Sequence, residues 1–201
     1  IYLFDGNNNS LWNYEAADDV YVVEISEDGE YIITGDDDET IYFFNKDSNE
    51  PIWDYDSDGK VRCVDISSDG EYVVVGTDET SDRRIYVFDK DSDDPLWEYN
   101  PQTSSDDVHC VDISEDGNFI SASYHSDTKR ILVWDRTNST PLWTISDTGL
   151  SGYNGGFKLE SSASGRYISA APDRDEMPFF LFENIGASED FLIPVSPRSG
   201  N

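Results

Sequence analysis

Basic residues are scarce in this sequence. Lys and Arg number 13 among 201 residues, against 43 Asp and Glu, which gives a formal net charge of −30 at pH 7. Nucleic acids and anionic membranes are polyanions that such a surface repels, so we expect no nucleic-acid partner and no acidic lipid partner. The carboxylates suit divalent cations, basic partners or a salty medium, and halophilic adaptation is one interpretation. The alternative interpretation is that acidic turns keep a β-rich surface soluble.

Long apolar runs, cysteine and histidine are also scarce. No run of about 18 apolar residues occurs, so we expect no membrane insertion in this segment. Cys63 and Cys110 are too few for a disulfide framework or a zinc site, and their matching places in VRCVDIS and VHCVDIS predict free, buried thiols. His109 and His125 stand in no recognisable catalytic motif, and GxSxG and HExxH are absent. These absences favour a protein that is not an enzyme.

Aromatic and β-branched residues are abundant and recur with one spacing. The 12 Tyr, 10 Phe and 5 Trp stand against a single Met, which favours strands over helices. Three markers repeat about every 40 to 48 residues: a pentapeptide that ends in an acid or amide, a turn sequence with Asp-Gly or Ser-Gly, and a Trp. The pentapeptides are IYLFD, IYFFN, IYVFD, ILVWD and FFLFE at residues 1–5, 41–45, 85–89, 131–135 and 179–183. The turn sequences are ISEDGEYI, ISSDGEYV, ISEDGNFI and SSASGRYI from residues 25, 66, 113 and 161, and the Trp residues are Trp12, Trp53, Trp97 and Trp143.

Each repeat predicts four short antiparallel strands and no helix. In the third unit these strands are expected at residues 61–67, 71–76, 84–89 and 95–99, with a tight Asp69-Gly70 turn after the first. Four short strands in each repeat of about 40 to 48 residues predict an all-β fold. We expect a β-propeller of four complete four-stranded blades plus a half blade, as part of a larger ring. One segment spans residues 1–201, with the half blade at 1–14 and blades at 20–56, 61–100, 108–146 and 155–196.

The half blade is expected to lack its two inner strands. An unpaired sheet edge of this kind is ready to pair with another chain. We therefore expect the missing strands to come from a longer polypeptide that closes the ring or, failing that, partner copies to cover the open edge.

The repeat resembles two propeller families. The turn ISEDGEYI with a later strand that ends in Trp-Asp, as ILVWD does at 131–135, resembles WD repeats, although the Gly-His pair of that family is missing. The interval from Asp89 to Trp97 resembles the repeat of pyrroloquinoline-quinone propellers. That second resemblance implies that the repeat Trp docks one blade onto the next and is buried between blades as a packing residue. Hybrid repeats of this kind resemble those of large acidic surface or secreted proteins of archaea and bacteria.

These features lead us to expect a non-enzymatic scaffold or binding module, extracellular or at the cell surface. Its partner would be a protein, a glycan or further copies of the chain. Asn8 and Asn138 match the N-glycosylation acceptor pattern, in agreement with this location. The alternative is a fragment of a quinoprotein-like or other propeller enzyme whose active site lies in blades missing from this chain.

Calcium is the one cofactor that the sequence suggests. Asp54, Asp56 and Asp58, followed by Gly59, match the start of a calcium loop, and Asp65 stands where the closing acid of a twelve-residue loop would lie. Against this, Asp54 is expected on an outer strand and Asp65 on the next inner strand, and acid-rich chains produce such spacings by chance. The calcium site is therefore a hypothesis, and we predict weak or absent calcium dependence.

Overall fold

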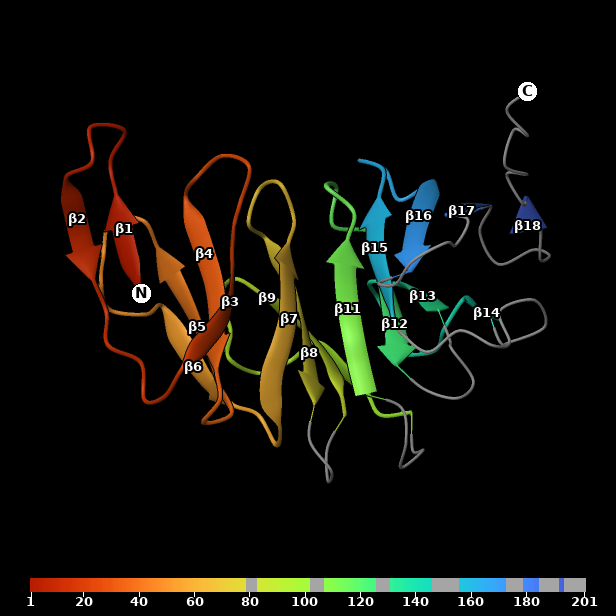
Figure 1. Cartoon of the computed structure of the whole chain (residues 1–201), viewed down its shortest axis with the longest axis horizontal. Helices are drawn as coiled ribbons and strands as arrows, with labels where there is room; N and C mark the ends of the chain where they lie inside the picture. The colour runs from red at the N-terminus through yellow and green to blue at the C-terminus, as the bar shows by residue number, and fades with distance from the viewer. Residues whose placement is uncertain are drawn as a thin grey trace.

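The chain folds into a row of antiparallel β-sheets (Figure 1). The computed structural model describes residues 1–78, 83–101, 107–125, 131–145, 156–172, 179–184 and 192–193. Within these ranges the secondary structure is strand and turn with no helix, so no helix there is long and apolar enough to cross a membrane. The sequence-based prediction of an all-β chain is confirmed.

Four sheets have four strands each, and a two-stranded sheet precedes them. In each larger sheet the strands pair in chain order and antiparallel. The first sheet holds β1 (Tyr2–Phe4) and β2 (Ser10–Asn13), and the second holds β3 (Val20–Ile25), β4 (Tyr31–Asp36), β5 (Thr40–Asn45) and β6 (Trp53–Asp56). The third holds β7 (Lys60–Ile66), β8 (Tyr72–Asp78), β9 (Ile85–Asp89) and β10 (Trp97–Tyr99). The fourth holds β11 (Asp107–Ile113), β12 (Phe119–His125), β13 (Ile131–Asp135) and β14 (Trp143–Ile145), and the fifth holds β15 (Phe157–Ser161), β16 (Tyr167–Pro172), β17 (Phe180–Glu183) and β18 (Leu192–Ile193).

In the second, third and fourth sheets the turn between the first two strands is built by a Ser-x-Asp-Gly sequence, and in the fifth sheet by Ser-Ala-Ser-Gly at residues 162–165. In the third sheet the Ser67 hydroxyl donates to Asp69 Oδ1 at 2.8 Å and accepts from the Tyr72 N–H at 3.0 Å. Gly70 takes a positive φ of 68°, which side chains with a Cβ rarely adopt. The same two bonds recur in the second and fourth sheets, and in the fifth sheet the Ser162 hydroxyl accepts from the Tyr167 N–H at 3.0 Å. The repeated sequence therefore codes for a repeated hairpin.

The Asp or Asn that ends each of the first four pentapeptides closes the next turn. Its side-chain oxygen accepts a hydrogen bond from the N–H two residues later, as Asp89 does from Asp91 at 3.0 Å and Asp135 does from Thr137 at 2.8 Å. Such Asx turns explain why Asp or Asn stands at the end of these four pentapeptides.

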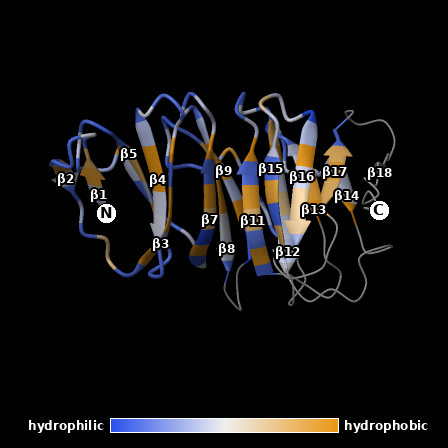
Figure 2. Ribbon diagram, turned by 45° about the horizontal axis from the view of Figure 1, so that its top comes forward, coloured by the Kyte–Doolittle hydropathy of each residue, from blue (hydrophilic) through white to orange (hydrophobic). Residues whose placement is uncertain are grey.

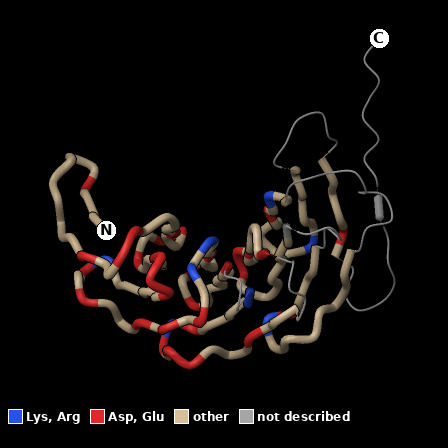
Figure 3. Tube along the Cα trace, turned by 60° about the horizontal axis from the view of Figure 1, so that its bottom comes forward, with Lys and Arg blue, Asp and Glu red and all other residues tan. Residues whose placement is uncertain are grey.

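Successive sheets pack face to face in an open arc (Figure 3), and we call each such contact a sheet joint. At a sheet joint, the first and third residues of a pentapeptide face the following sheet, and the second and fourth residues face the preceding sheet. The residues that meet are Ile41 and Phe43 with Tyr86 and Phe88, Ile85 and Val87 with Leu132 and Trp134, and Ile131 and Val133 with Phe180 and Phe182. Figure 2 shows these apolar strands beside hydrophilic turns. The strands are therefore apolar on both faces because both faces are covered.

The repeat Trp residues cross the sheet joints. Each indole Nε1 donates a hydrogen bond to the residue that follows the pentapeptide of the next sheet. The bonds run from Trp12 to the Lys46 carbonyl (2.6 Å), from Trp53 to the Lys90 carbonyl (3.0 Å), from Trp97 to the Arg136 carbonyl (2.6 Å) and from Trp143 to Asn184 Oδ1 (3.3 Å). Trp53 is buried, but the other three are half-buried. The prediction that all four are buried is therefore wrong for three of them. All four lie on the outermost strand of their sheet, where solvent reaches an indole unless other rings pack closely on it, as Phe43 and Phe88 do on Trp53 at 4.9 and 5.2 Å.

The four turns that follow the first strands are also bonded to one another through the main chain. The Asp28 N–H donates to the Ser68 carbonyl at 3.4 Å, the Ser68 N–H to the Glu115 carbonyl at 3.0 Å, and the Asp116 N–H to the Ala163 carbonyl at 3.0 Å. These bonds therefore link the four larger sheets to one another at one end of their first strands, β3, β7, β11 and β15, which we call the inner strands.

Candidate functional site

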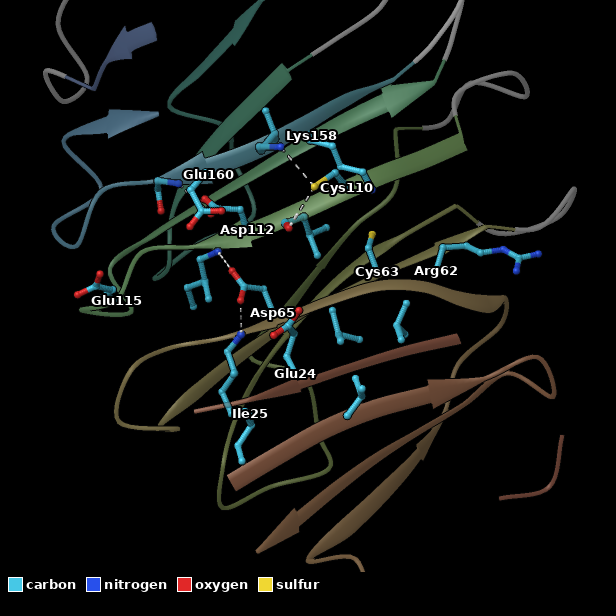
Figure 4. A pocket seen from close by; sticks show the side chains of 18 of the residues that line it. Glu24, Ile25, Arg62, Cys63, Asp65, Cys110, Asp112, Glu115, Lys158 and Glu160 are labelled. Carbon is cyan, nitrogen blue, oxygen red and sulfur yellow. Dashed lines mark hydrogen bonds between the residues drawn. The ribbon is translucent and has the colours of Figure 1, made fainter. Parts of the chain in front are cut away.

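The first strands of the four larger sheets, β3, β7, β11 and β15, line one pocket of about 670 Å³ (Figure 4). Its walls carry two rows of side chains, to which each of the four strands contributes. One row holds Glu24, Asp65, Asp112 and Glu160, and the other includes Cys63, Cys110 and Lys158. The pocket is therefore a product of the repeat, since equivalent positions of successive sheets are brought side by side.

The two central carboxylates of the first row bind the main chain of the first strand of the next sheet. Asp65 Oδ2 accepts a hydrogen bond from the Ile113 N–H at 2.7 Å, and Asp112 Oδ1 accepts one from the Ser161 N–H at 2.9 Å. Both groups thereby tie one inner strand to the next, which is a structural role. The carboxylates of Glu24 and Glu160, at the two ends of the row, accept no hydrogen bond from the described residues.

Desolvation disfavours the charged forms of this row, in which Asp112 is buried and Asp65 half-buried, while Glu24 and Glu160 are exposed. Desolvation raises the pKa of Asp65 to about 7, against the opposing effect of the hydrogen bond from the Ile113 N–H and with a further rise from Asp112. Desolvation likewise raises the pKa values of Asp112, Glu24 and Glu160. The negative charge of Glu160 on β15 repels that of Glu24 on β3 across the pocket and raises the pKa of Glu24 further. A positive group placed between them would relieve this repulsion.

Residues 1–131 match the family described as a family of unknown function, DUF5711. This chain belongs to that family. The matched residues include β3, β7 and β11, with Glu24, Asp65 and Asp112, while β15 and Glu160 lie beyond them. No curated protein matches the chain.

The cysteines lie in the pocket wall as free thiols. The Cys110 Sγ accepts a hydrogen bond from the Leu159 N–H at 3.5 Å. Both side chains are half-buried, which corrects the expectation of full burial, because both strands face the pocket. Desolvation raises the pKa of each thiol, which keeps both protonated at neutral pH and poorly nucleophilic.

The four Asp residues of the calcium hypothesis do not come together. Asp54 and Asp56 lie on β6, the outermost strand of the second sheet. Asp58 forms an ion pair of 3.1 Å with Arg84. Asp65 is in the pocket wall, bonded to Ile113. Among the described parts of the chain, no three Asp, Glu, His or Cys side chains form a group that could hold a metal ion.

His109 lines the pocket on β11, whereas the side chain of His125 lies outside the described residues. The sequence-based search did not select Glu24, Asp112 and Glu160, although a signal was present. Each stands just before the first residue of the repeated turn sequence, or at its equivalent, in VEIS, VDIS and LESS.

Proposed function

We propose that this chain is a β-propeller segment whose four larger sheets are blades related to WD and pyrroloquinoline-quinone repeats. The observation that carries the proposal is that the first strand of every larger sheet lines the same pocket. In a propeller four-stranded blades surround a central channel. In the pyrroloquinoline-quinone repeat, which this chain resembles, one Trp per blade docks on the next blade. The Trp hydrogen bonds across all four sheet joints support this assignment.

We propose further that the segment is a non-enzymatic module that binds a protein partner outside the cell or at its surface. The partner presents a Lys- or Arg-bearing segment to the acidic pocket. Glu24 and Glu160 would accept its positive groups, because their carboxylates are exposed and have no hydrogen-bond donor from the described chain, and because desolvation and neighbouring carboxylates disfavour their charged forms.

Asp65 and Asp112 have a different part in this proposal. Their oxygens already accept main-chain hydrogen bonds, so they hold the inner strands in register and supply negative potential without direct contact. Arg62 and Lys158 line the same pocket and would restrict the position of the incoming cation to the carboxylate row.

The experiment is a binding titration with a fluorescently labelled oligolysine peptide. We expect the double variant Glu24→Gln/Glu160→Gln to bind about tenfold more weakly than the unmodified chain, since each ion pair contributes up to about 1 kcal/mol. The matched control is Asp93→Asn/Asp94→Asn, which removes the same charge from two exposed residues outside the pocket. Equal weakening by the two variants would mean that the peptide senses only the net charge of −30, and the proposed site would be wrong.

A further inference from the structure

Lys158 differs from the other basic side chains that the structure describes. Arg136 lies over the ring of Tyr72, 3.8 Å from its centroid. Lys158 has no ring contact, ion pair or hydrogen bond of its side chain among the described residues. The remaining basic side chains all form ion pairs with Asp or Glu, and they are Lys46, Lys60, Arg62, Arg83, Arg84, Lys90 and Arg166. In a chain with 43 Asp and Glu, the Lys158 ammonium is therefore left available to a negative group of a ligand.

The side chain of Lys158 faces the pocket. On β15, Phe157 and Leu159 are buried, whereas Lys158 and Glu160 are exposed and line the pocket wall. Desolvation raises the pKa values of the Cys63 and Cys110 thiols, and the positive charge of Lys158 opposes this rise at both. Lys158 therefore points back toward β11 and β7, and Figure 4 shows it near Cys110.

Lys158 and Glu160 place opposite charges on one face of the same strand. Two residues of a β-strand span about 6.6 Å, and no ion pair joins these two side chains in the described structure. On β11 the equivalent places hold Cys110 and Asp112, whose side chains bond to the main chain of β15. The wall is therefore acidic in the row of Glu160 and Asp112 and positive at Lys158 in the next row.

The surroundings of Lys158 in its own row are uncharged. Cys63 and Cys110 share this row, and their raised pKa values keep both thiols neutral at pH 7. A negative group that reaches Lys158 thus meets no carboxylate in the same row, while a positive group two residues along the strand meets the acidic row.

We propose that the segment bound in the acidic pocket is a free C-terminus that ends in Lys or Arg, with its terminal carboxylate on Lys158. This inference rests on the proposed function, which places the positive side chain at Glu24 and Glu160. A C-terminal Lys carries both charges, and its side chain spans roughly 6 Å from the Cα to the ammonium. That span is close to the separation of the two rows. An internal Lys would offer Lys158 only a neutral main-chain carbonyl.

Net charge alone predicts the opposite preference. Conversion of the terminal carboxylate to a carboxamide removes one negative charge from a peptide, so a chain with a net charge of −30 should bind the amide more tightly. A contact between the carboxylate and Lys158 reverses this order. The preference between the two peptides therefore separates the proposed contact from general repulsion.

The test compares two pentapeptides of one sequence that ends in Lys, one with a free carboxylate and one with a carboxamide, each labelled at its N-terminus. Fluorescence titration of the whole chain should show about fivefold tighter binding of the free acid. Lys158→Gln should remove this preference by weakening the acid about fivefold without weakening the amide, and Lys158→Arg should retain it. The control Lys46→Gln removes the same charge outside the pocket and should also retain it.

Equal binding of the two peptides by the unmodified chain overturns the inference, as does a preference that survives Lys158→Gln or is lost in Lys46→Gln. The double variant Glu24→Gln/Glu160→Gln tests the proposed function separately and should weaken both peptides. If it does so while no preference for the acid exists, the acidic pocket stands and the C-terminal contact is wrong. If it weakens neither peptide, the acidic pocket itself is wrong. Since the changed side chains are exposed, far-ultraviolet circular dichroism of each variant should match that of the unmodified chain.

Discussion

Trp53 lies at the sheet joint between the second and third sheets, and its truncation tests how that joint is held. Its ring stacks on Phe43 with centroids 4.9 Å apart and packs on Phe88 at 5.2 Å, with a side chain that is 7% exposed. Its Nε1 also donates to the Lys90 carbonyl at 3.0 Å. Trp53→Ala should lower the free energy of unfolding by about 3 to 5 kcal/mol, because a buried aromatic leaves a cavity.

The variant Trp53→Phe separates the two contributions. It keeps an aromatic ring against Phe43 and Phe88 and removes the hydrogen-bond donor, so we expect a loss of about 1 to 2 kcal/mol. Trp97→Ala serves as a comparison and should lose less than Trp53→Ala, since Trp97 is half-buried. Urea unfolding followed by far-ultraviolet circular dichroism measures all three. A loss below about 1 kcal/mol for Trp53→Ala would refute the packing role, and equal losses for Ala and Phe would mean that only the hydrogen bond matters.

Three further predictions concern the inner strands and the calcium hypothesis. Gly76→Ala should lower the free energy of unfolding by about 1 to 3 kcal/mol, because an added Cβ would lie 2.5 Å from Val108 Cγ1; an unchanged urea midpoint would contradict the close approach. Because burial raises the pKa of Asp65 to about 7, the folded chain keeps a proton that the unfolded chain loses near pH 4, so stability should fall as pH rises from about 4 to 7. Thermal melts in high salt should show this fall, and Asp65→Asn should reduce it; a rise over the same window would reverse our assignment. Melts with calcium and with a chelator should coincide, whereas a calcium-specific rise that Asp56→Asn abolishes would establish a site that includes the Asp54 to Asp58 segment.

The all-β class and the four-stranded sheets could be predicted from the sequence because both depend on local signals. The Ser-x-Asp-Gly turn fixes each hairpin, and the pentapeptide with its terminal acid fixes the third strand and the turn after it. In the third unit, strands expected at 61–67 and 84–89 form at Lys60–Ile66 and Ile85–Asp89. These elements are set by residues that lie close together in the chain, where sequence patterns are most informative.

The candidate site was largely missed because it depends on alignment between sheets. Asp65 was selected as a calcium ligand from its spacing to Asp54, but its partner is Ile113 on the neighbouring inner strand. Glu24 and Glu160 are 136 residues apart and acquire meaning only when four inner strands line one pocket. A comparison of equivalent positions across the repeats would have found them, whereas a search for known metal motifs could not.

The main-chain bonds between the four turns that follow the first strands bear on how such a chain can grow by duplication of its gene segments. The atoms that join Ser68 to Glu115, and Asp116 to Ala163, are backbone N–H and carbonyl groups, which every residue except proline supplies. A copied unit that keeps the turn would therefore find its docking bonds already in place, whatever side chains it had since acquired. Recombination that adds or removes one whole repeat unit would keep these bonds and would be tolerated. Recombination that breaks a unit between the Ser and the Gly of its turn would remove them and destabilise the fold.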